Sequence, residues 1–124
     1  MNSISRAHSK NKYGNKKTVA EGVSHASKKQ ALRWIELRQA ERDGKIRNLR
    51  REVTYRLEVN GHLICKYIAD HVYEELISDF CGVNVDLWDP IVEDVKSAIT
   101  KKKRDYRIKY KLMKALHGID IREV

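Results

Sequence analysis

The sequence predicts a small α/β or α+β domain in which a mixed β-sheet is flanked by two helices. A helical pattern over residues 27–43 comes first, strand-like alternation fills the centre, and a second helical pattern covers residues 102–117. A last apolar segment, residues 119–124, suits an edge strand. The chain has 124 residues, which is the size of one domain. Elements in this order are expected to form layers around one core.

The N-terminal residues 1–17 are polar and basic, and we predict that they form a flexible arm. Residues 18–124 are then expected to form a single domain. This domain begins with two short strand patterns, residues 18–20 and 23–25, on either side of Glu21-Gly22. A glycine in such a two-residue gap is typical of a hairpin turn.

The first helix is predicted to begin at Ser27 and to end near Asp43. The Ser27 hydroxyl can accept a hydrogen bond from the first turn, and Gln30 completes a Ser-x-x-Gln capping box. Gly44 supplies the stop. The apolar face of this helix is expected to contain Ala31, Trp34, Ile35 and Leu37.

Two strands joined by a tight turn are predicted next. Residues 50–59 place apolar side chains at every second position, which is the period of a strand. Asn60-Gly61 is a strong signal for a two-residue hairpin turn. Residues 63–73 form the returning strand, and residues 74–90 show no regular pattern.

A third strand and a second helix complete the predicted order. Pro90, the single proline, is expected to mark the start of a strand over residues 91–97. The helix over residues 102–117 is expected to end at Gly118. Its apolar stripe is predicted to contain Ile108, Leu112, Ala115 and Leu116.

The formal net charge of +9 is unevenly distributed. Residues 1–51 contain 14 Lys and Arg against 4 Asp and Glu, and residues 89–124 contain 10 against 6. Residues 52–88 between them contain 2 against 7. Basic surfaces attract polyanions and speed their capture, so contact with nucleic acid is expected. The alternative is an ordinary solvated surface.

The two cysteines, Cys65 and Cys81, lack the spacing of a zinc site and are expected to be ordinary thiols of a reduced cytosolic protein. No apolar run approaches the ~20 residues of a membrane span. The N-terminus has no apolar signal region. We therefore expect a cytoplasmic protein without a membrane partner.

Two acids and a lysine form the candidate catalytic group. Asp94 and Lys96 are two residues apart in a predicted strand, so their side chains are expected on one face. Asp70 lies in the preceding apolar strand. Mg²⁺ needs only one or two carboxylates plus waters and substrate oxygens, and Asp70 and Asp94 could supply them for phosphodiester cleavage. Lys96 could position the water or offset charge. The alternative for Asp70 is a structural acid paired with a lysine.

Five stretches of the chain resemble a phage- and prophage-borne family of the PD-(D/E)XK nuclease superfamily. The resemblance covers roughly residues 12–118, and the stretches are Lys12-Tyr13-Gly14-Asn15-Lys16-Lys17-Thr18, Ser27-Lys28-Lys29-Gln30-Ala31, Gly44-Lys45-Ile46-Arg47-Asn48-Leu49, Tyr67-Ile68-Ala69-Asp70 and Val92-Glu93-Asp94-Val95-Lys96. The layout is similar too: a helix, a hairpin ending in a strand acid, a strand with acid-x-Lys, and a basic helix. This resemblance implies a restriction-endonuclease-like core.

The resemblance also implies roles for individual residues. Asp70 matches the metal-binding aspartate, Asp94 the second acid and Lys96 the catalytic lysine. Glu93 should face the opposite side of the strand and ranks below Asp94 as a metal ligand. The family usually has a glutamate where this chain has Gln30. An amide oxygen can still bind a metal ion or orient water, but it adds no negative charge.

The reaction implied by the resemblance is Mg²⁺- or Mn²⁺-dependent hydrolysis of DNA in the cytoplasm of a bacterial host. Small nucleases of the superfamily include resolvases, so by analogy the substrate could be branched DNA, such as a Holliday junction. Such resolvases act as dimers, so a homodimer is expected by the same analogy. The expected phosphate contacts are Lys16, Lys17, Lys28, Lys29, Lys101, Lys102, Lys103, Arg104 and Arg107. Two alternatives stay open: a nuclease fold without activity that binds DNA or protein, and one that inhibits a host defence.

Overall fold

The computed structural model describes residues 18–20, 23–25, 27–77 and 86–124, with side chains from residue 27 onward. The chain divides into two compact units, residues 1–36 and 37–124.

The first unit contains a two-stranded ribbon and the start of a helix. Strands β1 (Thr18–Ala20) and β2 (Val23–His25) pair antiparallel, which confirms the predicted short strands. The turn between them and the predicted arm, residues 1–17, lie outside the described residues.

Helix α1 (Lys28–Arg42) begins in the first unit and ends in the second. The Gln30 backbone N–H donates to Ser27 Oγ at 3.2 Å, which confirms the predicted cap. Three of the four predicted apolar-face residues, Ala31, Trp34 and Leu37, are buried. Ile35 is 42% exposed, so its assignment to that face was wrong. It lies about 100° around the helix from Trp34, beyond the buried stripe.

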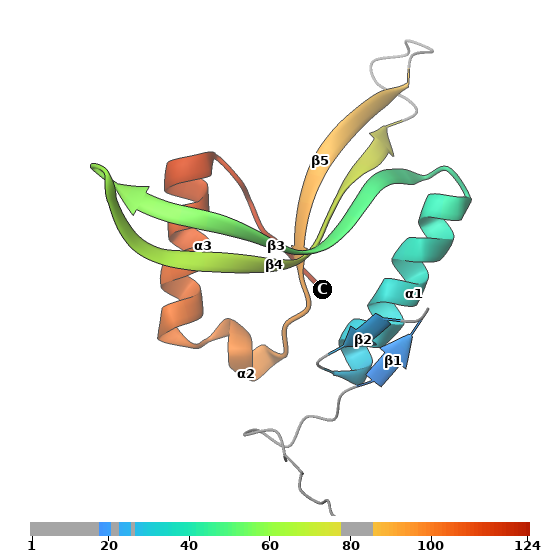
Figure 1. Ribbon diagram of the computed structural model, residues 1–124, viewed down its shortest axis with the longest axis horizontal. Coiled ribbons are helices and arrows are strands. Elements are labelled where there is room, and N and C mark those ends of the chain that lie inside the picture. The colour runs from blue at the N-terminus through green and yellow to red at the C-terminus, as the bar shows by residue number, and fades with distance from the viewer. Residues whose placement is uncertain (1–17, 21–22, 26, 78–85) are drawn as a thin grey trace, which may run out of the picture. The chain divides into compact units, whose positions relative to one another are not determined.

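The second unit is built on a four-stranded mixed sheet with the order β3-β4-β5-β6 (Figure 1). Its strands are β3 (Ile46–Val59), β4 (His62–Ile77), β5 (Leu87–Asp94) and β6 (Arg122–Glu123). β3 pairs antiparallel with β4, and β4 pairs antiparallel with β5. β6 is parallel to β5. The predicted hairpin turn is confirmed, with positive φ at Asn60 (53°) and Gly61 (80°). The chain is therefore a small α+β protein with a mixed sheet.

The strands are longer than the sequence pattern predicted. Residues 74–77 and 87–90, which were predicted to be irregular, extend β4 and β5 and pair with each other. Pro90 lies inside β5, opposite Glu74, and does not start the strand. β6 pairs only with Glu93 and Asp94 among the described residues, so the edge of β5 beside Pro90 needs no N–H donor.

The C-terminal helical region is two helices, where one was predicted. A single turn, α2 (Ala98–Lys101), precedes α3 (Arg104–His117). The buried residues of α3 are Tyr106 and Met113, and Leu112 is partly buried. The predicted stripe was wrong at Ile108, Ala115 and Leu116, which are exposed. Gly118 ends α3 with φ 69°, as predicted.

Each face of the sheet in the second unit has a buried core cluster. One core cluster joins the sheet to α3 and consists of Leu57, Tyr67, Ala69, Val72, Val92, Tyr106, Met113 and Ile121. The other lies on the opposite face and consists of Leu37, Ile46, Tyr73 and Ile91. Cys65 is a half-buried free thiol, and Cys81 lies outside the described residues. Within the described part of the chain, no helix has the length and apolar character of a membrane span.

Candidate active site

The two candidate aspartates lie at the end of the β4–β5 ladder. The last pair in this ladder is His71 with Glu93, so Asp70 and Asp94 come next on adjacent strands. In the β3–β4 ladder the register continues from Arg51↔His71 to Val53↔Ala69, on either side of Asp70. Glu52, between Arg51 and Val53, has φ of 54°, which is uncommon for a residue with a side chain.

Asp70 is held on one side by a backbone donor and on the other by a second acid. Its Oδ2 accepts the Val95 N–H at 2.8 Å. Burial, a hydrogen bond to the Asp94 carboxyl and the Asp94 charge raise the pKa of Asp70 to about 8. The Val95 N–H and the Lys96 charge oppose this rise. Two carboxyl groups in contact cannot both be ionised cheaply, so without a cation Asp70 keeps its proton to a higher pH than an isolated carboxyl does.

Asp94 is fully buried and only one of its oxygens has donors. Tyr67 donates its hydroxyl to Oδ2 at 2.7 Å, and Lys96 Nζ lies 3.3 Å from the same oxygen. Oδ1 has no hydrogen-bond donor among the residues that the structure describes. Burial and the Asp94 charge raise the pKa of Tyr67, so its hydroxyl stays a donor. A buried carboxylate oxygen beside a second carboxyl is a place where the Asp70 proton, or a cation in its stead, is stabilised.

Lys96 reaches Asp94, as predicted, although not through strand alternation. β5 ends at Asp94, so the predicted strand over residues 91–97 was too long. The C-terminal residue holds the backbone instead: Val124 N–H donates to the Asp94 carbonyl at 3.0 Å, and Lys96 N–H donates to the Val124 carbonyl at 3.1 Å. The Lys96 ammonium also lies 5.0 Å from the centre of the Tyr106 ring.

Glu93 belongs to the opposite face of the sheet. Its carboxylate contacts His71 Nδ1 at 3.3 Å and accepts the Tyr73 hydroxyl at 2.6 Å. All three side chains are buried. This is the face that the sequence predicted for Glu93, and the structure does not bring Glu93 to Asp70 and Asp94.

The Tyr73 hydroxyl continues this second network to the sheet edge. It accepts a hydrogen bond from Arg122 at 3.3 Å, and Arg122 makes two further bonds to Glu75, at 3.0 and 3.2 Å. These contacts anchor β6 from the face opposite the two aspartates. Sequence reasoning missed them because β6 is distant from β4 in the chain.

Gln30 lies in the first turn of α1, in the unit of residues 1–36. Its role beside Asp70 and Asp94, which belong to the other unit, stays a prediction. Lys28 and Lys29 are exposed in the same turn. Lys16 and Lys17 lie outside the described residues.

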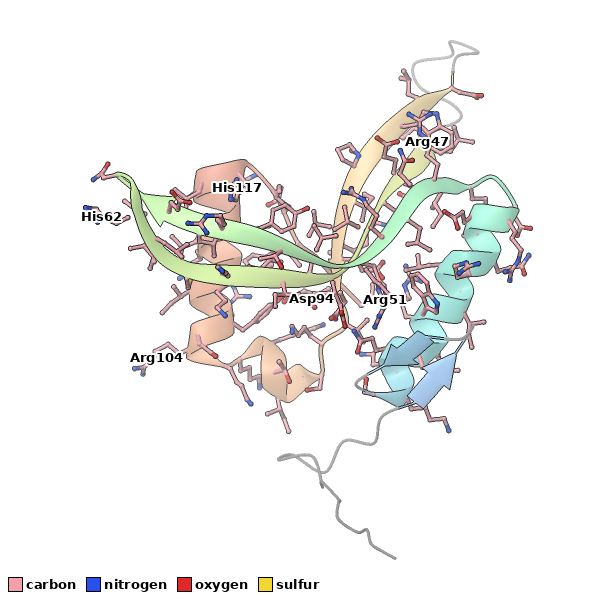
Figure 2. The ribbon with its side chains drawn as sticks, viewed as in Figure 1. Arg47, Arg51, His62, Asp94, Arg104 and His117 are labelled. Carbon is pink, nitrogen blue, oxygen red and sulfur yellow. The ribbon has the colours of Figure 1, made fainter. Side chains whose placement is uncertain are left out.

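Four of the five predicted phosphate-contacting residues after Lys96 form one continuous segment, residues 101–104. Lys101 ends α2, Lys102 and Lys103 link the helices, and Arg104 begins α3. All but Lys101 are exposed. Arg107 is half-buried, with its guanidinium 4.7 Å from the centre of the Tyr110 ring. Figure 2 shows Asp94 at the end of β5 and Arg104 at the start of α3.

The donor set suits a magnesium or manganese ion better than zinc. No cluster of three or more His, Cys, Asp and Glu side chains occurs in the described part of the chain. A tetrahedral zinc site needs three or four such ligands. Mg²⁺ needs one or two carboxylates and completes its shell with water and phosphate oxygens. Asp70 and Asp94, with the Asp94 Oδ1 lacking a donor, fit that requirement.

No protein-family model, curated protein or solved structure matches this chain. The geometry around Asp70 and Asp94 therefore carries the functional argument.

Proposed function

We propose that this protein is a small Mg²⁺-dependent DNA endonuclease. The observation that carries the proposal is the contact of the Asp70 and Asp94 carboxyls, with the Lys96 ammonium 3.3 Å from Asp94. Two acids and a lysine are the groups that metal-assisted phosphodiester hydrolysis uses. The resemblance to PD-(D/E)XK nucleases assigns the same three residues, and it implies a restriction-endonuclease-like core.

Each residue of the group has a distinct task in this proposal. Asp70 and Asp94 would hold Mg²⁺ or Mn²⁺, which when bound neutralises phosphoryl charge and lowers the pKa of a water. The Tyr67 hydroxyl fixes the Asp94 carboxylate through the bond at 2.7 Å. Lys96 offsets the negative charge that grows on the phosphoryl oxygens as the transition state forms.

The proposed reaction is hydrolysis of one phosphodiester bond. A water oxygen bonds to phosphorus, the bond from phosphorus to the departing sugar oxygen breaks, and that oxygen leaves as an alcohol after taking up a proton. The protein must therefore hold a strongly anionic backbone at Asp94. The exposed cations Lys102, Lys103 and Arg104, a few residues after Lys96, are placed in the chain to do this.

The second candidate function is binding without cleavage. Gln30 stands where the resembling family has a glutamate, and the described residues offer two carboxylates rather than three. A fold of this kind that holds metal poorly could act as a DNA- or protein-binding module, or as an inhibitor of a host defence. Branched-DNA preference and a homodimer belong to the nuclease proposal by analogy alone.

A cleavage assay separates these functions. Linear, nicked and four-way-junction DNA are incubated with the protein and Mg²⁺ or Mn²⁺, beside Asp94→Asn and the matched control Asp120→Asn. Asp120 is an exposed acid that pairs with Lys114 at 2.8 Å. Cleavage by the parent and the control, but not by Asp94→Asn, supports the nuclease.

DNA retention by all three proteins with no cleavage supports the binding module. In that case Gln30→Glu shows whether position 30 is the cause. A gain of Mg²⁺-dependent cleavage in this variant would place the missing charge at Gln30.

A further inference from the structure

The short helix α2 contributes nothing to the protein core. None of its four residues is buried. Ile99 is 75% exposed, the highest value among the large exposed hydrophobic residues described; the next are Ile64 and Ile68 at 57%. Burying an isoleucine side chain stabilises a protein by about 1.5–3 kcal/mol. Ile99 makes little of this contribution, because most of its surface stays exposed. Folding of the chain alone therefore does not explain why an apolar residue stands here.

Local hydrogen bonds nevertheless hold Ile99 in place. Ser97 Oγ accepts the Thr100 N–H at 3.1 Å and lies 2.9 Å from Thr100 Oγ1. Lys102 N–H donates to the Ile99 carbonyl at 3.2 Å. The turn is thus fixed by its own capping groups rather than by packing, which reduces the ordering cost of any contact that Ile99 makes.

The surroundings of Ile99 are cationic. Lys101, Lys102, Lys103 and Arg104 follow it directly. Within the described residues, Lys101, Lys102 and Arg104 form no ion pair. An apolar side chain next to these cations suits a partner that is anionic outside and apolar within. Stacked bases between phosphate backbones have this chemistry. An anionic lipid bilayer shares it, and the place of Ile99 three residues after Lys96 is what favours DNA.

The chain also places Ile99 close to the proposed cleavage site, three residues after Lys96. We propose that Ile99 inserts between two adjacent bases beside the phosphate at Asp94 and Lys96, and unstacks that step. This inference rests on the proposed nuclease function and adds how the substrate is held. Insertion costs a few kcal/mol of stacking and least at nicks and junctions, so the wedge favours DNA that is already interrupted.

The inference is tested with 2-aminopurine, whose fluorescence rises when it is unstacked. The label is placed at successive positions around a nick and a four-way junction, and DNA is bound by the full chain carrying Asp94→Asn, so that it is not cut. We expect a rise at one step that disappears with Ile99→Ala and persists with Ile99→Leu. The affinity of Ile99→Ala should fall about tenfold, as expected for the loss of part of a buried isoleucine. The matched control is Ile108→Ala on α3, an isoleucine that is 50% exposed.

The outcomes separate this inference from the nuclease proposal. A fluorescence rise that Ile99→Ala leaves intact, or no rise at any position, overturns the wedge even if the parent cleaves DNA. An Ile99-dependent rise, together with a parent protein that cleaves none of these DNAs with Mg²⁺ or Mn²⁺, supports the wedge and sinks the nuclease proposal. Equal affinity losses in Ile99→Ala and Ile108→Ala would also overturn the wedge.

Discussion

Lys96 Nζ lies 3.3 Å from Asp94 Oδ2, although the strand that carries Asp94 ends before Lys96. The backbone between them is held by Val124, whose N–H and carbonyl bond Asp94 and Lys96. The C-terminal residue thus sets the position of the lysine. If Lys96 is the charge-stabilising group, its loss should affect cleavage far more than folding.

Lys96→Ala is predicted to lower the cleavage rate by about 10²–10³-fold, the effect of removing one transition-state donor. DNA affinity should change little, because Lys96 is a single cation among many. The control is Lys111→Ala, an exposed lysine on α3. Rates measured under single-turnover conditions decide the point. An equal loss of rate in both variants would mean that Lys96 contributes only general charge.

The stability of the metal-free protein is predicted to fall as pH rises. The pKa of Asp70 is about 8 in the folded protein against 3.8 ordinarily. Between these values the folded state holds a proton that the unfolded state has lost, so stability decreases over this range and levels off above it. Denaturant unfolding in EDTA at about pH 5 and about pH 9 measures this slope. Asp70→Asn should flatten the slope and be the more stable protein at the higher pH.

Divalent cations are predicted to reverse this trend. A cation held by Asp70 and Asp94 displaces the proton on Asp70, so the affinity for the cation should increase as pH rises towards about 8. The melting temperature should therefore rise more on adding Mg²⁺ or Mn²⁺ at the higher pH. Asp94→Asn should abolish this response. A rise in melting temperature of the same size in Asp94→Asn would show that the ion binds elsewhere.

Tyr67→Phe is predicted to destabilise the fold by about 1.5–3 kcal/mol, because it removes a hydrogen bond to a buried carboxylate. The bond lost is the one at 2.7 Å to Asp94 Oδ2. Tyr110→Phe, on a half-buried ring that packs against the same core, is the matched control and should change stability little. Urea unfolding midpoints compare the two. A Tyr67→Phe protein as stable as the parent would contradict the assigned bond.

Glu93→Gln and Asp94→Asn are predicted to affect different properties, stability and metal binding, although the two residues are neighbours. Glu93 is buried with His71 and Tyr73, so its substitution should lower stability and leave metal binding intact. Asp94→Asn should abolish metal binding. Mn²⁺ titration calorimetry on both folded variants provides the comparison. Loss of Mn²⁺ binding in Glu93→Gln would mean that the two faces had been assigned the wrong way round.

Local signals in the sequence predicted the local structure well. Ser27 and Gly44 bracket α1, and Asn60-Gly61 makes the hairpin turn, because capping and turn residues act on their own neighbours. The extents of β4 and β5 depend instead on pairing between distant segments. The sequence therefore predicted Pro90 as the start of a strand. Pro90 lies inside β5 instead, where no described strand pairs with that edge and no N–H donor is needed.

The site shows the same division between local and distant causes. The pairing of Asp94 with Lys96 could be predicted from their spacing, and the contact with Asp70 from the resemblance. The Tyr67 hydroxyl and the backbone of Val124 could not, because both reach Asp94 only through the tertiary fold. The buried face of α3 was missed for a related reason. Tyr106 and Met113 are buried because they pack against the sheet, while Ile108 is exposed.

The central claim is that Asp70 and Asp94 together hold one divalent cation. Anomalous diffraction from crystals soaked in Mn²⁺ tests it most directly, since it locates the ion rather than its effect. We predict an anomalous peak between the two carboxyl groups that disappears in Asp94→Asn. Crystals that show no peak there at saturating Mn²⁺, or a peak that survives in Asp94→Asn, would contradict the account.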